Sequence, residues 1–346
     1  MTKPAICERG ISVENKRELQ LQAWCESVIG QSQQDLQPVF GDARPWRYYR
    51  ITDGVRSFIA VDTKNTAIAM DNYRAVADAY REHGMQVPGL IAEHQQHGFM
   101  LMTDLGSSLL LSHLRESTLT QWYPKVYPQM AEIMQVRETA RGPLPEFNEA
   151  LLREELALMA DWLFREHLQL MLTTAEQQIW RDFCDALVAN ALAQPQVGVH
   201  RKFHARNILV QPDESLAVTG FHDAAIGPIT YDAVSLLRDC YVSWPAQIVA
   251  QLSTACYDYL RQIREDVAVS PAVWQRWFDL MGLQRHCYVC GLFARRCERD
   301  GNPGYLQDIP RNLAYLQEVA VNYAEFDEFR EFLTERVMPA VAAVNK

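Results

Sequence analysis

The sequence predicts an α+β protein with a small N-terminal sheet region followed by a larger helical region. In the N-terminal part, short apolar-aromatic runs alternate with turns, as in Val39 to Asp53 and Ser57 to Asp62 around Asp53-Gly54. From Leu109 onward, helical periodicity dominates. With 346 residues, 48% of them hydrophobic, the chain is long enough to bury a large core and to form two lobes.

The N-terminal part is expected to contain two helices and a second pair of strands. An amphipathic helix over residues 13–30 places five apolar side chains near one stripe: Leu19, Leu21, Trp24, Val28 and Ile29. A second helix covers Asn72 to His83 and ends at Gly84, a residue that favours helix termination. Strands are predicted over Gly89 to Ala92 and Gly98 to Met102.

The C-terminal part is predicted to be built mainly from helices that follow one another through short connections. Their expected ranges are 121–138, 147–170, 174–193, a helix beginning near 231, 246–263, 271–283 and a tail helix from 325.

The segment from Val199 to Pro245 interrupts these helices. Two apolar runs, Ile208 to Val210 and Leu216 to Val218, are joined by a polar turn and predict a hairpin. Polar residues gather at its open end. We therefore expect Asn207 and the Gly220 to Asp223 stretch to lie side by side.

The order of polar residues in this segment resembles a known catalytic loop. His200-Arg201-Lys202-Phe203-His204-Ala205-Arg206-Asn207 follows the pattern H-x-D-x-x-x-x-N of the aminoglycoside phosphotransferase and choline kinase superfamily. The resemblance is closer still to bacterial kinases that phosphorylate the anomeric hydroxyl of N-acetylmuramate and N-acetylglucosamine. Two blocks typical of those kinases are intact, Gly227 to Asp232 and Ser235 to Tyr241.

The resemblance extends over nearly the whole chain and implies a two-lobed, protein-kinase-like fold. It assigns residues 1–105 to an N-terminal lobe and residues 106–346 to a helical C-terminal lobe that carries the segment 199–245. It implies ATP and Mg²⁺ as cofactors and a small sugar-like ligand as acceptor.

Two positions depart from the family pattern at its working carboxylates. The family's catalytic Asp corresponds to Lys202, and its first metal-binding Asp corresponds to Gly220. A lysine with a reference pKa of about 10.4 is a poor general base near neutral pH. Magnesium prefers oxygen ligands, and glycine offers none from a side chain. Lys202 is instead suited to attract phosphate directly, which favours binding over turnover.

Other residues of the segment are candidates to replace or complete the missing functions. By resemblance, Asn207 supplies a metal ligand, and Asp223 is a second candidate ligand. His222 and Asp223 are the candidate replacement bases. On the acceptor side, the candidates are His204, His167 and Asp232, with packing in a helix or core as the alternative role of the two histidines.

Nucleotide binding is expected at two places in the N-terminal lobe. The stretch Gly41 to Arg50 resembles the family's phosphate turn, but Arg44-Pro45 replaces a small pair and the proline lacks a backbone N–H. Arg44 and Arg47 either bind phosphate by charge or are ordinary solvated arginines. Asp104 lies in a hinge-like motif, where adenine would pair with neighbouring backbone groups.

Three functions remain open at this point. The first is a catalytically impaired, pseudokinase-like member of the amino-sugar branch that acts by ligand binding or by regulating a protein partner. The second is an active ATP-dependent kinase for amino sugars or aminoglycosides that uses His222, Asp223 or Asp232 in altered roles. The third is a structural interaction protein with an empty cleft.

Composition argues against a nucleic-acid-binding, a membrane-spanning or an exported protein. A formal net charge of −10 disfavours nucleic-acid binding, and no apolar run reaches the roughly 20 residues that span a bilayer. The N-terminus lacks an apolar signal core, so a cytoplasmic protein is expected. Among the eight cysteines, Cys287 and Cys290 are three apart in a helical pattern, and buried thiols are expected there rather than half of a metal site.

Overall fold

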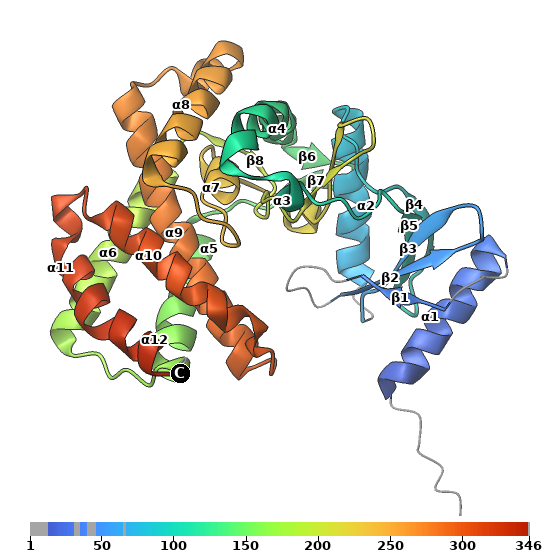
Figure 1. Ribbon diagram of the computed structural model, residues 1–346, viewed down its shortest axis with the longest axis horizontal. Helices are drawn as coiled ribbons and strands as arrows, with labels where there is room; N and C mark the ends of the chain where they lie inside the picture. The colour runs from blue at the N-terminus through green and yellow to red at the C-terminus, as the bar shows by residue number, and fades with distance from the viewer. Residues whose placement is uncertain (1–12, 31–34, 40–45, 65–66, 345–346) are drawn as a thin grey trace, which may run out of the picture. The chain divides into compact units, whose positions relative to one another are not determined.

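The computed structural model describes residues 13–30, 35–39, 46–64 and 67–344 (Figure 1). The chain divides into two compact units. Unit 1 comprises Met1–Ala77 and Pro88–Gly106, and unit 2 comprises Asp78–Val87 and Ser107–Lys346. The boundary predicted at residue 105 leaves Asp78–Val87 with the first lobe. In the structure, this segment belongs to unit 2, where Tyr80 packs on Phe221 with 5.3 Å between ring centroids.

Unit 1 contains a five-stranded antiparallel sheet in the order β1-β2-β3-β5-β4. The β2–β3 hairpin turns at Asp53-Gly54, as predicted, and Gly54 adopts a positive φ of 91° that glycine tolerates without strain. The strands are β1 (Gln37–Pro38), β2 (Arg47–Thr52), β3 (Ser57–Asp62), β4 (Leu90–His94) and β5 (Phe99–Thr103).

The helix α1 (Val13–Ile29) covers one face of this sheet. Leu21 and Cys25 are fully buried against alternate sheet residues such as Tyr49 and Phe58. Leu19 was predicted to lie in the same stripe but is 58% exposed. The buried stripe runs instead through positions four apart, as the helical repeat requires.

Unit 2 is mainly helical and contains three two-stranded ribbons. Its strands are β6 (Glu138–Thr139), β7 (Gly142–Pro143), β8 (Gln196–Val199), β9 (Ile208–Val210), β10 (Leu216–Val218) and β11 (Ala225–Pro228). Its helices are α3 (Leu110–His113), α4 (Leu119–Gln135), α5 (Glu149–Leu158), α6 (Thr174–Leu192), α7 (Tyr231–Leu237), α8 (Ala246–Ile263), α9 (Pro271–Glu298), α10 (Ile309–Ala320), α11 (Asp327–Phe332) and α12 (Met338–Val344), while α2 (Ala67–Glu82) spans both units.

Two helices of unit 2 differ most from their predicted extents. The helix expected over 147–170 changes to a π-helix at Met159–His167. The helix α9 continues fifteen residues beyond the predicted end at Leu283, up to Glu298. Gly291 in α9 explains part of this arrangement, because a Cβ there would stand 2.3 Å from a backbone atom of Leu158. The missing side chain lets α9 pack closely against the start of the π-helix.

The hairpin predicted in the central segment is confirmed as β9 and β10. Their antiparallel register pairs Leu216 with Val210 and Val218 with Ile208. Beyond the last pair, the Thr219 N–H donates to the Asn207 carbonyl at 2.9 Å. Asn207 and the segment beginning at Gly220 therefore lie side by side, as the sequence indicates.

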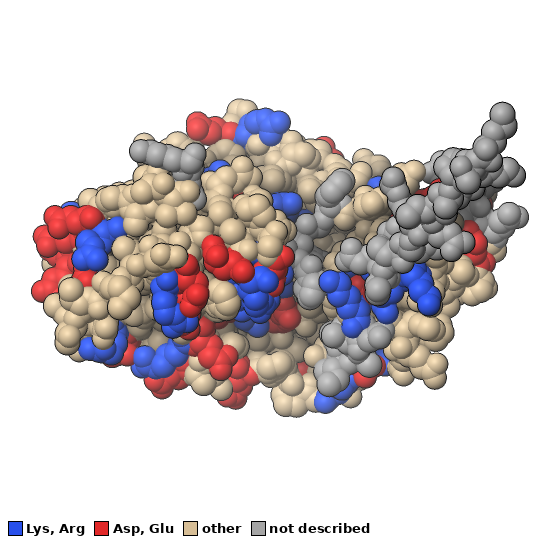
Figure 2. All heavy atoms as spheres, turned by 90° about the horizontal axis from the view of Figure 1, so that it is seen from below, with Lys and Arg blue, Asp and Glu red and all other residues tan. Residues whose placement is uncertain are grey.

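The cysteines of the C-x-x-C spacing lie inside α9. Cys287 and Cys290 are fully buried, and burial raises the pKa of both thiols. Among the described residues, no helix is both long and apolar enough to cross a bilayer. On the face shown in Figure 2, acidic and basic side chains lie beside one another.

Candidate functional site

The loop that follows β8 is held by a buried carboxylate from the start of α7. Asp232 accepts the backbone N–H of His200 at 2.6 Å and that of Arg201 at 3.0 Å. The Asp232 side chain is almost fully buried, and burial raises its pKa to about 7 against the effect of these two hydrogen bonds. Both oxygens serve the loop backbone, so Asp232 orders the site. Its predicted role toward the acceptor stays a prediction.

A buried ion pair fixes the side of the loop that faces α5. The Arg201 guanidinium donates to Glu155 at 2.6 Å, and Glu155 is only 3% exposed. Arg285 of α9 donates to the Arg201 carbonyl and to the Tyr231 hydroxyl, each at 3.2 Å. Arg201 itself has φ of 67°, a left-handed conformation that only surrounding contacts can hold in a residue with a side chain.

His200 links this loop to the turn after the hairpin. The Lys202 N–H donates to His200 Nδ1 at 3.2 Å, so Nδ1 is the unprotonated nitrogen. The other nitrogen, Nε2, then carries the proton and donates to the Thr219 carbonyl at 3.0 Å. A neutral histidine of one tautomer thus positions both Lys202 and the residue that precedes Gly220.

Lys202 and Asp223 form an ion pair at the centre of the site. The Lys202 ammonium donates to Asp223 Oδ2, and the two side chains are 28% and 40% exposed. Burial opposes ionisation of Asp223, but the positive charges of Lys202 and His222 outweigh it and hold the pKa of this carboxyl well below its usual range. His222 Nε2 lies 3.6 Å from the same oxygen. Asp223 is therefore an ionised carboxylate neutralised by an ammonium.

The predicted magnesium ligands form an incomplete set. The Asn207 amide nitrogen donates to the Lys202 carbonyl at 2.9 Å and lies 3.3 Å from His204 Nε2. Gly220 offers no side-chain oxygen, and its φ of 84° places it in the left-handed region. A divalent cation would have to share Asp223 with the Lys202 ammonium. These residues fit Mg²⁺ poorly, because a positive charge already stands among the oxygen donors.

The two histidines predicted for the acceptor side lie in different surroundings. His204, within the catalytic-loop-like segment, is buried and meets the Tyr241 ring edge-on at 5.4 Å. His167 ends the π-helix, and its Nδ1 lies 2.7 Å from Glu298 at the end of α9. The contact with Glu298 gives His167 a hydrogen-bonding role within the protein. For both histidines, a contact with the acceptor stays a prediction.

In unit 1, the arginine predicted for phosphate binding faces a buried acid. Arg47 donates to Asp62 at 2.8 Å, and Arg17 of α1 donates to the other oxygen of the same carboxylate at 2.5 Å. Asp62 is 1% exposed. Arg47 is therefore part of the packing between α1 and the sheet, and its contact with nucleotide stays a prediction. Arg44 lies outside the described residues.

Asp104 is also engaged by neighbours within unit 1. Its carboxylate accepts hydrogen bonds from Arg50 at 2.5 Å, from the Ser57 hydroxyl at 2.6 Å and from the Gly106 N–H at 2.9 Å. A carboxylate can accept about four hydrogen bonds, and these contacts together with a second one from Arg50 nearly fill that capacity. Asp104 thus holds the backbone at Gly106, and its predicted role toward a nucleotide stays a prediction.

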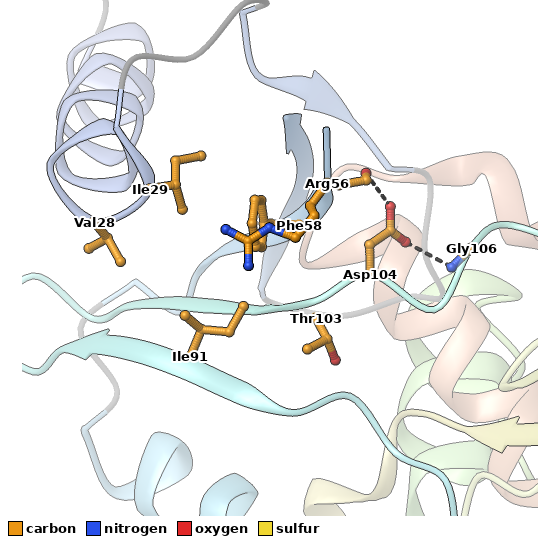
Figure 3. A pocket seen from close by; sticks show the side chains of 9 residues that line it. Val28, Ile29, Arg56, Phe58, Ile91, Thr103, Asp104 and Gly106 are labelled. Carbon is orange, nitrogen blue, oxygen red and sulfur yellow. Dashed lines mark hydrogen bonds between the residues drawn. The ribbon is translucent and has the colours of Figure 1, made fainter. Parts of the chain in front are cut away.

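A cavity of about 740 Å³ lies beside this hinge, between the end of α1 and the sheet (Figure 3). Its wall is mostly apolar, and the polar side chains in it are already paired: Arg56 with Asp53, and Asp104 as described above. Its lining residues are Val28, Ile29, Arg56, Ser57, Phe58, Ile91, Thr103, Asp104 and Gly106. None of the predicted catalytic or metal-binding residues lines this cavity.

Sequence reasoning missed three residues that shape the site: Glu155, Arg285 and Tyr288. The run Gln284-Arg285-His286 also resembles the family's sequence, and that resemblance was the available signal for Arg285. Glu155 follows Glu154, and only the structure distinguishes the buried glutamate from the exposed one. Burial raises the pKa of Tyr288 to about 12, and the carboxylates of Glu155 and Asp223 act in the same direction. Tyr288 is therefore within electrostatic range of the Lys202–Asp223 pair.

Comparison with known proteins agrees with the resemblance seen in the sequence. The profile of the phosphotransferase enzyme family matches residues 35–265. The N-acetylmuramate/N-acetylglucosamine kinase of Pseudomonas aeruginosa is 32% identical over 333 residues, covering 92% of this chain and 97% of that protein. The protein of the same name from Pseudomonas putida is 34% identical over 322 residues, covering 90% of each.

Solved structures show the same fold at low sequence identity. A choline kinase from Streptococcus pneumoniae aligns with a TM-score of 0.63 and 10% identity, covering 88% of this chain and 99% of that one. A thermostable mutant of an aminoglycoside phosphotransferase aligns with a TM-score of 0.60 and 14% identity, with the same coverage. The predicted protein-kinase-like phosphotransferase fold is confirmed.

Proposed function

We propose that this chain, which belongs to the phosphotransferase enzyme family, binds a nucleotide and an amino-sugar-like ligand but transfers phosphate slowly or not at all. Relatives named as amino-sugar kinases suggest the ligand class. A solved relative bound to AMP supports a nucleotide. The finer claim, impaired transfer, rests on residues of this chain alone.

The observation that carries the proposal is the ion pair between Lys202 and Asp223. Phosphoryl transfer needs a group that orients the acceptor hydroxyl and takes its proton, and it needs metal ligands for the phosphates. At the position of the proton-accepting group, this chain has the Lys202 ammonium. That ammonium also forms an ion pair with the nearby Asp223 carboxylate. One substitution thus removes a base and weakens a metal site.

An active kinase with rerouted residues is the runner-up, and the surroundings of its candidate bases disfavour it. Asp232 is buried and holds two loop amides. Asp223 has a lowered pKa, so it is a weak proton acceptor. The His222 side chain is only 11% exposed and lies beside Asp223. None of the three combines an accessible atom with a proton affinity near neutral pH.

Nucleotide binding without magnesium is the first test. We expect ATP to raise the melting temperature both with Mg²⁺ and with EDTA, because the Lys202 ammonium supplies a positive charge that the metal supplies in an ordinary kinase. In EDTA, Lys202→Ala should weaken ATP binding by roughly 10–100-fold, the usual value of a charge-assisted hydrogen bond. Calorimetric titration measures both affinities.

Lys125→Ala serves as the control, since Lys125 forms a surface ion pair with Glu214 in the same unit. It should leave ATP affinity unchanged. Binding that needs Mg²⁺ and ignores Lys202 would contradict the metal-substitute role. If ATP does not bind under either condition, the alternative of a structural protein with an empty cleft is favoured instead.

A further inference from the structure

The last turn of α9 and the residue that follows it carry three arginines, and one of them lacks an ion-pair partner. Arg296 pairs with Asp300 at 2.9 Å, and Arg299 pairs with the same carboxylate at 2.7 Å. Glu298, the other nearby acid, is engaged with His167. Within the part of the chain that the structure describes, the Arg295 guanidinium has no hydrogen-bond acceptor or ion-pair partner, and its Nε is buried.

This arrangement is costly for the free protein. Arg295 is half-buried, and burial together with the charges of Arg299 and Arg296 lowers its pKa. Buried charges are normally paired, because an unpaired charge loses its solvation by water and gains no ion pair or hydrogen bond in return. An unpaired guanidinium of this kind suggests that a ligand supplies the missing anion.

The position of Arg295 relates it to the Lys202–Asp223 pair. Arg295 follows Tyr288 by seven residues, which places the two side chains on the same face of α9, about 10 Å apart along its axis. Arg285, three residues before Tyr288 on the same helix, donates to the Arg201 carbonyl at 3.2 Å, so this part of α9 borders the loop that carries Lys202. A ligand lying along this face from Tyr288 would reach the guanidinium with its far end.

We propose that Arg295 binds a carboxylate of the acceptor-side ligand, so that the site prefers an acidic amino sugar to a neutral one. This inference rests on the proposed function. A planar guanidinium offers two parallel N–H donors to a carboxylate, which suits it to this recognition better than a lysine. N-acetylmuramate carries such a carboxylate, and N-acetylglucosamine does not, so the two sugars form a matched pair of probes.

The experiment measures the affinity of both sugars by calorimetry for the full-length wild type, Arg295→Gln and Arg299→Gln. The wild type should bind N-acetylmuramate at least tenfold more tightly than N-acetylglucosamine. Arg295→Gln should lose that preference, with the affinity for the neutral sugar changed less than threefold. Arg299→Gln, which removes an arginine already paired with Asp300, should keep the preference.

A second readout needs no ligand. At low salt, Arg295→Gln should raise the melting temperature of the free protein, because it removes an uncompensated charge, while Arg299→Gln should not raise it. Equal affinities for the two sugars in the wild type, or a preference retained in Arg295→Gln, would overturn the inference and leave the proposed function standing. If neither sugar binds the wild type, the amino-sugar part of the proposed function fails. An unchanged melting temperature in Arg295→Gln would then show that the proposed anion site is wrong as well.

Discussion

The double variant Lys202→Asp, Gly220→Asp should transfer phosphate from Mg²⁺-ATP to amino sugars faster than the wild type by about 10²–10⁴-fold. That range is the usual contribution of a general base, and restoring a metal ligand adds to it. The substitution at Lys202 acts twice, because it places a carboxylate at the base position and releases Asp223 from its ammonium partner. An ADP-release assay with N-acetylmuramate and N-acetylglucosamine measures the gain.

The backbone at Gly220 is already shaped for the reversal. Its φ of 84° and ψ of 15° lie in the left-handed region, which aspartate occupies more readily than most residues. The strain should cost at most about 1–2 kcal/mol. We therefore expect a folded double variant with a slightly lower melting temperature.

The matched control is Lys202→Asn with Gly220→Asn, which has nearly the same shape and the same strain but no carboxylates. It removes the ammonium without supplying a base, so its turnover should stay near the wild-type level. A double Asp variant that folds and binds ATP but gains no activity would show that the roles assigned to these two positions are wrong.

The variant Glu155→Gln should destabilise the protein by about 3–5 kcal/mol, since it leaves the Arg201 guanidinium buried without its counter-charge. The Arg201 side chain is only 19% exposed, so solvent can replace the lost counter-charge only in part unless the loop moves. Its left-handed backbone, held by Asp232 and Arg285, makes such a movement affect Lys202 as well. Thermal and urea unfolding measure the loss, and ATP affinity should fall with it.

Glu154→Gln is the control on the neighbouring residue of α5, where the side chain is exposed. It should change stability by less than about 0.5 kcal/mol, as surface substitutions usually do. A Glu155→Gln protein as stable as this control would mean that the buried pair does not support the loop.

The parts of the fold that depend on local pattern could be predicted from the sequence. The apolar runs around 208–218 specify a hairpin, and the hairpin alone brings Asn207 next to Gly220. The predicted end of α9 at Leu283 was wrong, because the helix continues to Glu298 through Gly291, where the missing side chain allows a close approach of backbone to backbone. Such a contact involves residues more than a hundred positions away and leaves no local signal.

The candidate site was predictable in its residue types and not in its pairing. Lys202 and Asp223 were both identified, but nothing in the sequence shows that one neutralises the other. Arg47 and Asp104 have the chemistry expected of nucleotide contacts, yet each meets an internal partner of opposite charge. Ion pairs between residues distant in sequence are fixed only when the chain has folded.

Steady-state phosphate transfer by the unmodified protein is the decisive measurement. With saturating Mg²⁺-ATP and N-acetylmuramate, and with binding of both confirmed separately, we expect a turnover number at least about 10²-fold below the roughly 1–100 s⁻¹ typical of kinases. A turnover number inside that range would show that an ammonium beside Asp223 and a glycine at position 220 do not impair the chemistry.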